Sequence, residues 1–299
     1  MHRFVHLVFL LATVAQAQSV YVLGTAQDGG YPHIGCSRTC CRLALDSNRH
    51  ESVVALAVAD TVRHQWWLVE ATPDLTTQLQ LFRNLTDSAY PFLPAGILLT
   101  HAHIGHYTGL MYLGREAMGA RNVPVYCMPE MARFLSQNGP WKQLVEQKNI
   151  LLNPMQFDDT LRLGASTAVV PVQVVHRDEF SETAGFRILA GNRRVLFIPD
   201  IDKWEKWGRN IIPEVQQSDI ALLDATFYSA AELPGRRMAE VPHPFVMETM
   251  AKFESQSPAT RSKVYFIHFN HTNPALWNPE IQHFIKQKGF FLAKTGGKL

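Results

Sequence analysis

The chain has 299 residues, of which 46% are hydrophobic and 18% are charged, and its formal net charge is +2. This is ordinary globular composition, and the length suffices for one large core or two modest ones. No basic stripe or long run of like charges occurs, so nothing in the sequence favours binding to nucleic acid or to a membrane surface.

Residues 1–17 have the pattern of a secretory signal peptide. Arg3 is basic, residues 4–14 are mostly apolar, and Ala15-Gln16-Ala17 fits the small-x-small cleavage rule. We expect cleavage after Ala17 and a periplasmic or secreted product. The apolar run is too short to span a bilayer, and no later segment reaches about 18 uninterrupted apolar residues, so no membrane span is expected. An uncleaved buried strand or helix is the alternative.

Strand-like apolar runs, many of them rich in Val and Ile, recur along the remaining chain. They cover residues 19–24, 52–58, 65–70, 96–100, 123–127, 168–176, 185–189, 194–199, 220–224, 263–269 and 290–293. Amphipathic helical stretches lie between them at 72–85, 128–136, 141–147, 245–254 and 279–288. Thr72 is the expected N-cap of the first helix, with Pro73 following it. Strands and helices alternate throughout, so we expect one layered α/β domain over residues 18–299.

The most informative segment is Thr100-His101-Ala102-His103-Ile104-Gly105-His106, which begins where the apolar run at 96–100 ends. A loop that leaves a buried strand gives metal ligands a rigid base, and neutral imidazole suits zinc, iron, copper and nickel. His101 and His103 alternate and can point the same way, whereas His106 can reach the site from another side. A solvated polar loop is the alternative.

Further potential ligands stand at the ends of later apolar runs. They are His176, Asp200, Asp224 and His268, with His271 three residues beyond the last of them. If these strands share a sheet, their ends converge on one edge, where α/β proteins place their sites. Any one of these residues alone is more often a satisfied polar group at a strand end. Together they indicate a metal site.

In order and spacing these residues resemble the signature of the metallo-β-lactamase-fold hydrolases. That signature is His-x-His-x-Asp-His after a strand, then a His, a bridging Asp and a last His. The resemblance implies an αββα four-layer sandwich with the site at one edge between two sheets. Residues 23–30, 35–36, 71–74 and 268–274 are also similar to the branch that contains the coenzyme PQQ synthesis protein B, to which ribonuclease Z and a phosphonate-pathway cyclic phosphodiesterase are related.

The resemblance implies two metal positions that share Asp200. The first would be held by His101, His103 and His176, and the second by His106 and His268. Three imidazoles plus a carboxylate or water form the ligand set of a catalytic zinc site with an open position. Gly105 stands where the family has a carboxylate, so we expect the second site to be weaker. One firmly held zinc is the favoured outcome, and iron in a two-His-one-carboxylate set is the alternative.

His243 lies just before the helical stretch at 245–254. By the same resemblance it corresponds to a proton-donating histidine that follows an Asp-Ala-Thr-Phe-like segment, here residues 224–227. It is therefore a candidate general acid, and with Asp200 it completes the expected catalytic set. A histidine that caps the next helix is the alternative. Asp224 is better explained as a residue that orients a ligand histidine.

Cys36, Cys40 and Cys41 place three thiols in one expected loop. Three thiolates and one imidazole make a closed structural zinc site, and the resemblance to the phosphodiesterase implies that His271 is the fourth ligand. His33 is a weaker candidate for that place. A disulfide from Cys36 to Cys40 or Cys41 is the alternative that export favours.

These observations predict an exported metal-dependent hydrolase that uses metal-activated water on a phosphoester, a lactone or a similar small molecule. One alternative is a PQQ-biosynthesis-type protein that uses iron for an oxidation or carries the cofactor. Another is a non-catalytic binding protein whose second metal site has decayed, for which Gly105 is the reason. The expected partner is a small-molecule substrate, and the sequence indicates neither its identity nor an oligomeric state.

Overall fold

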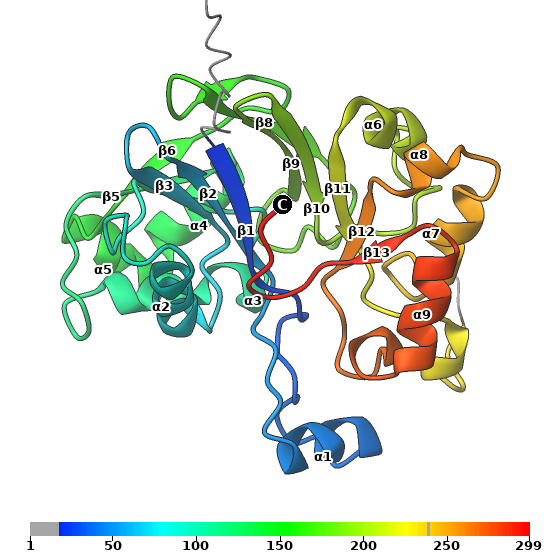
Figure 1. The fold of residues 1–299 in the computed structure, drawn as a ribbon. Coiled ribbons are helices and arrows are strands. Elements are labelled where there is room, and N and C mark those ends of the chain that lie inside the picture. The colour runs from blue at the N-terminus through cyan, green and yellow to red at the C-terminus, as the bar shows by residue number, and fades with distance from the viewer. Residues whose placement is uncertain (1–17, 238–239) are drawn as a thin grey trace, which may run out of the picture.

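A computed structural model describes residues 18–237 and 240–299 of the chain, so the expected signal peptide at 1–17 lies outside the described residues. Two β-sheets pack face to face, and helices cover the outer face of each (Figure 1). The architecture is therefore the αββα sandwich of the metallo-β-lactamase fold, as the resemblance to that family implied. No helix among the described residues has the length and apolar character needed to cross a membrane.

Each half of the chain contributes one sheet. The first sheet runs in the order β1 (Gln18–Gly24), β2 (Ala55–Asp60), β3 (Gln65–Val69), β4 (Gly96–Leu98), β5 (Val123–Cys127) and β6 (Ile150–Pro154). The second runs β13 (Phe291–Leu292), β12 (Val264–Ile267), β11 (Ile220–Asp224), β10 (Arg193–Ile198), β9 (Ala184–Ala190), β8 (Thr167–Gln173) and β7 (Leu161–Arg162). In both sheets the early strands pair antiparallel, and the later strands pair parallel through longer crossovers.

The helices of the described residues are α1 (Thr39–Asp46), α2 (Leu75–Leu85), α3 (Ile104–Tyr107), α4 (Pro129–Gln137), α5 (Trp141–Glu146), α6 (Ile211–Gln217), α7 (Val246–Lys252), α8 (Pro258–Arg261) and α9 (Pro279–Gln287). Most of them cover the two outer faces, whereas α1 projects beyond the sheets (Figure 1). In Figure 1, α2, α4 and α5 lie beside the first sheet, and α6 to α9 lie beside the second.

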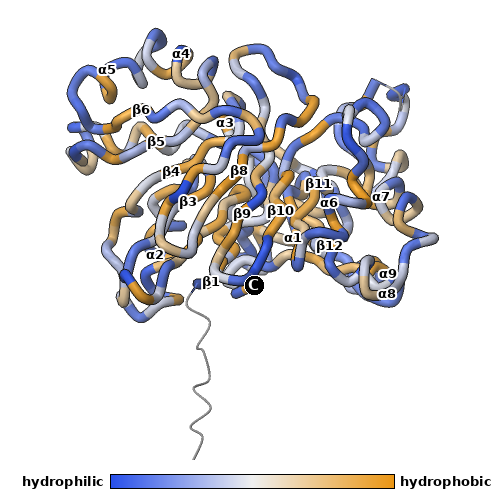
Figure 2. The backbone as a smooth tube through the Cα atoms, turned by 90° about the horizontal axis from the view of Figure 1, so that it is seen from above, coloured by the Kyte–Doolittle hydropathy of each residue, from blue (hydrophilic) through white to orange (hydrophobic). Residues whose placement is uncertain are grey.

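The alternation of side chains along each strand builds the layers. Val22 of β1 and Trp67 of β3 pack between the sheets against Phe186 and Phe197 of the second sheet. Trp66, the neighbour of Trp67, points the other way and stacks on Phe82 of α2, with 4.2 Å between ring centroids. Strands buried on both faces are apolar at nearly every position, as the hydropathy along the tube shows (Figure 2). Each such large side chain stabilises the fold by about 1.5–3 kcal/mol.

Three local expectations differ from the structure. The helix α2 begins at Leu75 and has Asp74 as its N-cap. The Thr72 hydroxyl accepts a hydrogen bond from Asp74 N and donates one to Gln78 Oε1, so it stabilises the turn that precedes the helix. Cys40 and Cys41 lie in helix α1, where the sequence predicts a loop. The strands β6 and β7 were not predicted, since their residues are only partly buried and lack a continuous apolar run.

Candidate metal centre

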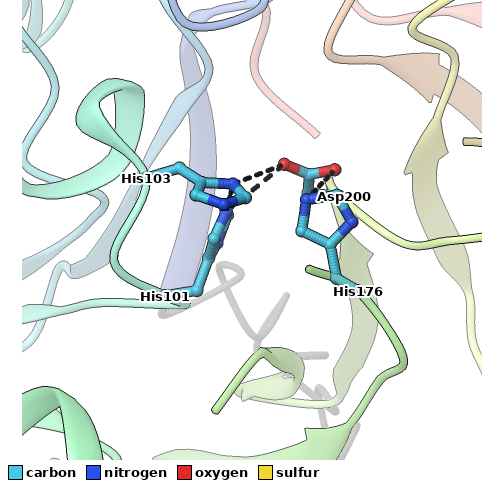
Figure 3. Close-up of side chains that lie close together, drawn as sticks. All are labelled: His101, His103, His176 and Asp200. Carbon is cyan, nitrogen blue, oxygen red and sulfur yellow. Dashed lines mark hydrogen bonds and ion pairs between the residues drawn. The ribbon is translucent and has the colours of Figure 1, made fainter. Parts of the chain in front are cut away.

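Four of the predicted ligands meet at one edge of the sandwich. Ligand atoms of His101, His103, His176 and Asp200 all lie within 4.8 Å of one another (Figure 3). The His101 Nε2 atom lies 3.3 Å from Asp200 Oδ2, and His176 Nε2 lies 3.2 Å from Asp200 Oδ1. His103 presents its Nδ1 atom to the same space, 4.0 Å from Asp200 Oδ2. The structure therefore brings together every residue expected around the first metal.

Strand ends bring these side chains together. β4 ends at Leu98 and β10 at Ile198, and the histidine segment and Asp200 follow them directly. β10, β11 and β12 run parallel, so the residues after them gather on one edge of the sheet. His103 becomes the N-cap of α3, and this short helix turns His106 back towards the centre.

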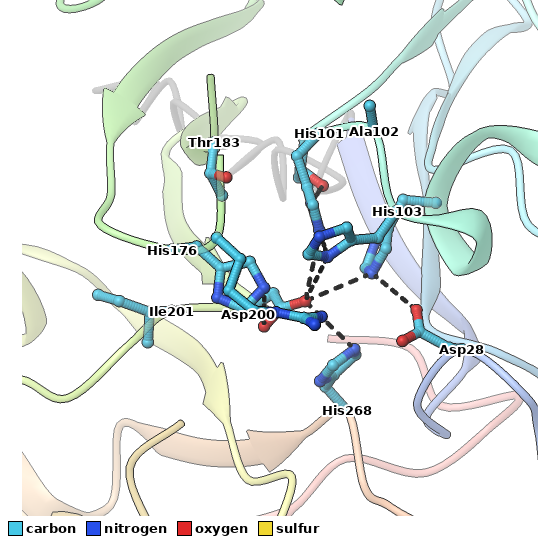
Figure 4. Close-up of polar contacts among 12 residues, drawn as sticks. Asp28, His101, Ala102, His103, His176, Thr183, Asp200, Ile201 and His268 are labelled. Carbon is cyan, nitrogen blue, oxygen red and sulfur yellow. Dashed lines mark hydrogen bonds and ion pairs between the residues drawn. The ribbon is translucent and has the colours of Figure 1, made fainter. Parts of the chain in front are cut away.

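A second group of ligands adjoins the first. It consists of Asp28, His106 and His268, whose ligand atoms again lie within 4.8 Å of one another. Asp28 comes from the loop after β1, and Figure 4 shows it on the side of the centre away from His176. The Asp200 Oδ2 atom lies 3.8 Å from His106 Nε2 and 3.9 Å from His268 Nε2, so Asp200 stands between the two groups.

Electrostatics in the centre favour a cation. Burial alone would raise the pKa of Asp200, but His176, His243 and His268 around it hold that pKa well below its usual value. Burial lowers the pKa of His101 well below its usual value, and the neighbouring His106 lowers it further. An ionised carboxylate and a neutral imidazole are the forms that bind metal ions.

Three of the ligand histidines, His101, His106 and His268, each have a neighbour at the ring nitrogen that faces away from the centre. Thr100 Oγ1 lies 2.9 Å from His101 Nδ1, and Thr226 Oγ1 lies 2.9 Å from His268 Nδ1. The fully buried Glu70 places Oε1 3.3 Å from His106 Nδ1. Such outer partners set the ring orientation of metal-binding histidines. In all three rings they leave Nε2 to face the centre.

His243 and Asp224 form a pair beside the centre. His243 is 4% exposed, and its Nδ1 atom lies 2.8 Å from Asp224 Oδ2 and 3.1 Å from Asp200 Oδ1. Burial lowers the pKa of His243, but Asp224 and Asp200 together raise it to about 10. The N-cap of α7 is Phe245, so the alternative that His243 caps this helix is wrong.

Backbone strain concentrates at the same place. Glu70 has a φ of 75°, His243 of 75° and His268 of 65°, values that non-glycine residues rarely adopt. Such outliers cost on the order of 1–3 kcal/mol each and persist where the surroundings enforce them. Here they aim one orienting carboxylate and two imidazoles at a common point.

The donor set fits one or more divalent ions. Among the described residues, several buried atoms that face the centre make no hydrogen bond. They are the Nε2 atoms of His106, His176 and His268 and the Oδ1 atoms of Asp28 and Asp200. Buried polar atoms are rarely left without a partner, and imidazoles with carboxylates are the ligands that zinc and related metals accept.

The cysteine group is separate from this centre. The Sγ atoms of Cys36, Cys40 and Cys41 lie within 4.8 Å of one another, and no disulfide joins them in the part of the chain that the structure describes. Burial raises the pKa of Cys41 to about 12. His271 is outside this group, and its ring stacks on His33 with 4.4 Å between centroids. A structural zinc with His271 as fourth ligand stays a prediction.

The fold and this site define a class. Residues 65–269 match the beta-lactamase superfamily domain, so the chain belongs to the β-lactamase superfamily, in its metallo-β-lactamase fold. Within the superfamily the chain is similar to coenzyme PQQ synthesis protein B. It is 24% identical to that protein from Nitrosococcus oceani over 291 residues, which cover 86% of this chain and 91% of the relative.

Two solved structures share the fold. The Zn(2+)-bound PqqB from Methylobacterium extorquens superposes with a TM-score of 0.75 at 20% identity, covering 94% of this chain and 99% of that one. A diphosphatase from the PhnP family superposes with a TM-score of 0.68 at 22% identity, covering 94% and 96%. At these identities the likeness establishes the fold, and the chemistry rests on the residues of this chain.

Three residues of the centre were not predicted from the sequence as site residues. Asp28 was noted only as part of a motif, Thr226 only as part of a segment, and Glu70 only as the end of a strand. Glu70 carried a weak signal, since a carboxylate that directly follows a buried apolar strand needs a partner. Asp28 carried none, because its neighbour at the site is 78 positions away in the sequence, at His106.

Proposed function

We propose that the chain is a metal-dependent hydrolase that directs water at a phosphoester, a lactone or a similar small molecule. The observation that carries this proposal is the buried set of unpartnered ligand atoms around Asp200. Fold neighbours that include a diphosphatase agree with a general hydrolase class. Zinc is the metal we expect first, because three imidazoles and one carboxylate match its catalytic sites.

His101 Nε2, His103 Nδ1 and His176 Nε2 would hold the first ion, with Asp200 shared towards the second group. A divalent ion in such a set lowers the pKa of water to about 7 and so supplies a nucleophile near neutral pH. Thr100 and Glu70 keep the rings from turning, which holds the ligand geometry without the substrate's help.

His243 would supply the proton for the leaving group. Asp224 and Asp200 hold the ring at Nδ1, so proton transfer to substrate falls to Nε2. As the ester bond breaks, this proton goes to the leaving oxygen, which departs as a neutral alcohol. Phe227 packs beside His243, at 6.2 Å between ring centroids, and also lines a surface cavity of about 520 Å³. Arg38 and Arg236 line the same cavity and suit an anionic substrate group.

The general-acid role predicts a dependence on the leaving group. In His243→Ala, hydrolysis of a cyclic phosphate of an aliphatic diol should slow by about 10²–10⁴-fold, since its alkoxide must be protonated as it leaves. Hydrolysis of bis(4-nitrophenyl) phosphate should slow far less, because nitrophenolate leaves without a proton. The measurement is kcat for both substrates with the zinc-loaded protein.

His283→Ala, a substitution of a histidine on α9 outside the centre, is the control and should leave both rates unchanged. An equal loss on both substrates in His243→Ala would mean that His243 only supports the site. Metal content of the variant, measured alongside, distinguishes a lost ion from a lost proton donor.

A PQQ-biosynthesis-type protein is the second candidate, and the observation that favours it is the similarity to coenzyme PQQ synthesis protein B over most of the chain. Metal identity separates the two candidates. Elemental analysis of the purified protein should find zinc for the hydrolase. Iron, together with no hydrolysis of either phosphate ester, would favour the second candidate.

We also propose that the hydrolase is exported, with residues 1–17 as its cleaved leader. The support is the basic start, the apolar run and Ala15-Gln16-Ala17. When the full chain is expressed in a bacterium, the mature protein should start at Gln18 and appear in the periplasm or medium. An intact Met1 start in a cytosolic fraction, found by N-terminal mass spectrometry, would contradict export.

A further inference from the structure

Gly105 has no room for a side chain because Asp28 occupies the space. A Cβ atom at position 105 would lie 2.2 Å from Asp28 Oδ1 and 2.6 Å from Asp28 Cα, where real contacts essentially never fall below 3.0 Å. The backbone of Gly105 is helical and needs no glycine for its conformation. The glycine is therefore explained by the close approach of Asp28 alone.

The Asp28 carboxylate enters the centre beside the second pair of histidines. Its Oδ1 atom is buried, makes no hydrogen bond among the described residues, and lies 3.6 Å from His106 Nε2. His106 Nε2 and His268 Nε2 are likewise buried without a hydrogen bond. Three unpartnered ligand atoms thus face one another within 4.8 Å.

The surroundings fix these groups in place. Glu70 at His106 Nδ1 and Thr226 at His268 Nδ1 hold both rings so that Nε2 is the free nitrogen. Asp200 Oδ2 lies within 4 Å of both Nε2 atoms and adds a fourth oxygen or nitrogen donor. When they bind a metal ion both imidazoles are neutral, so with two carboxylates the ligand set carries a charge of −2, which one divalent cation neutralises.

We propose that Asp28 supplies the carboxylate of a second divalent-cation site, together with His106, His268 and the shared Asp200. The carboxylate that position 105 lacks is delivered from the loop after β1, and Gly105 leaves the space for it. On this proposal Gly105 does not weaken the second site, contrary to the expectation from the sequence. The proposal rests on the proposed metal-dependent function, and it makes the centre a two-ion centre.

Zinc stoichiometry tests the proposal directly. The metal-free protein is titrated with Zn²⁺ by calorimetry, and bound zinc is counted after gel filtration. After gel filtration, Asp28→Asn should retain one zinc equivalent fewer than the unchanged protein. In the calorimetric titration, the affinity for that zinc should fall by more than the roughly 10–100-fold typical of losing a residue that only orients a ligand. Zinc at the cysteine group, if present, is common to both proteins and cancels in the difference. Asp46→Asn, an exposed aspartate at the end of α1, is the control and should lose none.

If Asp28→Asn folds poorly, a second pair of variants moves the aspartate from position 28 to position 105. Gly105→Asp alone should clash with Asp28 and lower the melting temperature, whereas Asp28→Gly combined with Gly105→Asp should regain the zinc equivalent and the melting temperature. An Asp28→Asn protein that keeps every equivalent at unchanged affinity would overturn the proposal. If Asp28→Asn binds one zinc equivalent fewer but the unchanged protein hydrolyses neither phosphate ester, the second cation site stands and the proposed hydrolase function does not.

Discussion

His103→Ala should abolish turnover and remove tightly bound metal from the first site. His103 directs Nδ1 to the centre, and its Nε2 atom is held 2.9 Å from Glu179 Oε2. Loss of an outer partner costs about 10–100-fold in metal affinity, and loss of a ligand itself should cost more. The measurement is zinc content after dialysis against a weak chelator, with kcat on bis(4-nitrophenyl) phosphate.

The substitution leaves the fold in place. His103 is the N-cap of α3 but makes no capping hydrogen bond with its side chain, so alanine removes no helix cap. His50→Ala, which removes an exposed histidine, is the matched control and should keep both zinc and activity. Activity that persisted in His103→Ala after chelation would end the hydrolase proposal.

Asp200→Asn should have a still wider effect, because it removes the anion on which the whole centre depends. Ring nitrogens of His101, His103, His106, His176, His243 and His268 lie within 4.0 Å of its carboxylate. The amide has the same shape but no charge, so we expect the protein to lose metal from both groups of ligands and all turnover.

The same change should destabilise the metal-free protein. Breaking a buried charge pair by removing one partner costs about 3–5 kcal/mol, and Asp200 is 2% exposed. Urea unfolding with excess chelator measures this cost, and zinc is counted at a temperature well below unfolding. Asp159→Asn, at an exposed position, should change neither quantity. If Asp200→Asn kept a full complement of zinc, Asp200 would not be a shared ligand.

Much of the fold was predictable because buried strands appear in the sequence as continuous runs of apolar residues. Strands such as β5 and β11 match the predicted residues 123–127 and 220–224 from end to end, since they are buried within the sandwich. The strands β6 and β7 and the helix α1 are only partly buried and have no such apolar run. In α1 only Cys40, Cys41 and Ala44 are buried, so this short helix has too few apolar positions to show a clear helical period in the sequence.

The ligand histidines were predictable for a related reason. His101, His103 and His106 stand close together in the chain, and His176, Asp200 and His268 each follow a buried strand. Parallel strands bring their ends to one edge, so position after a strand implies position in the site. His243 was the harder case, because it lies in a loop and only its contacts with Asp200 and Asp224 place it beside the centre.

By its local patterns the sequence predicted a layered α/β domain with candidate ligands at strand ends, since apolar periodicity and strand ends are local properties of the chain. The αββα arrangement and the sharing of Asp200 between two metals followed only from the resemblance to the metallo-β-lactamase-fold hydrolases. The tertiary structure alone decided what Gly105 means. The sequence alone indicates a missing metal ligand at this position, whereas the structure shows that the absence of a side chain leaves space for Asp28. A contact between residues so far apart in the sequence depends on how the loop after β1 packs against α3, and no local sequence pattern encodes that packing.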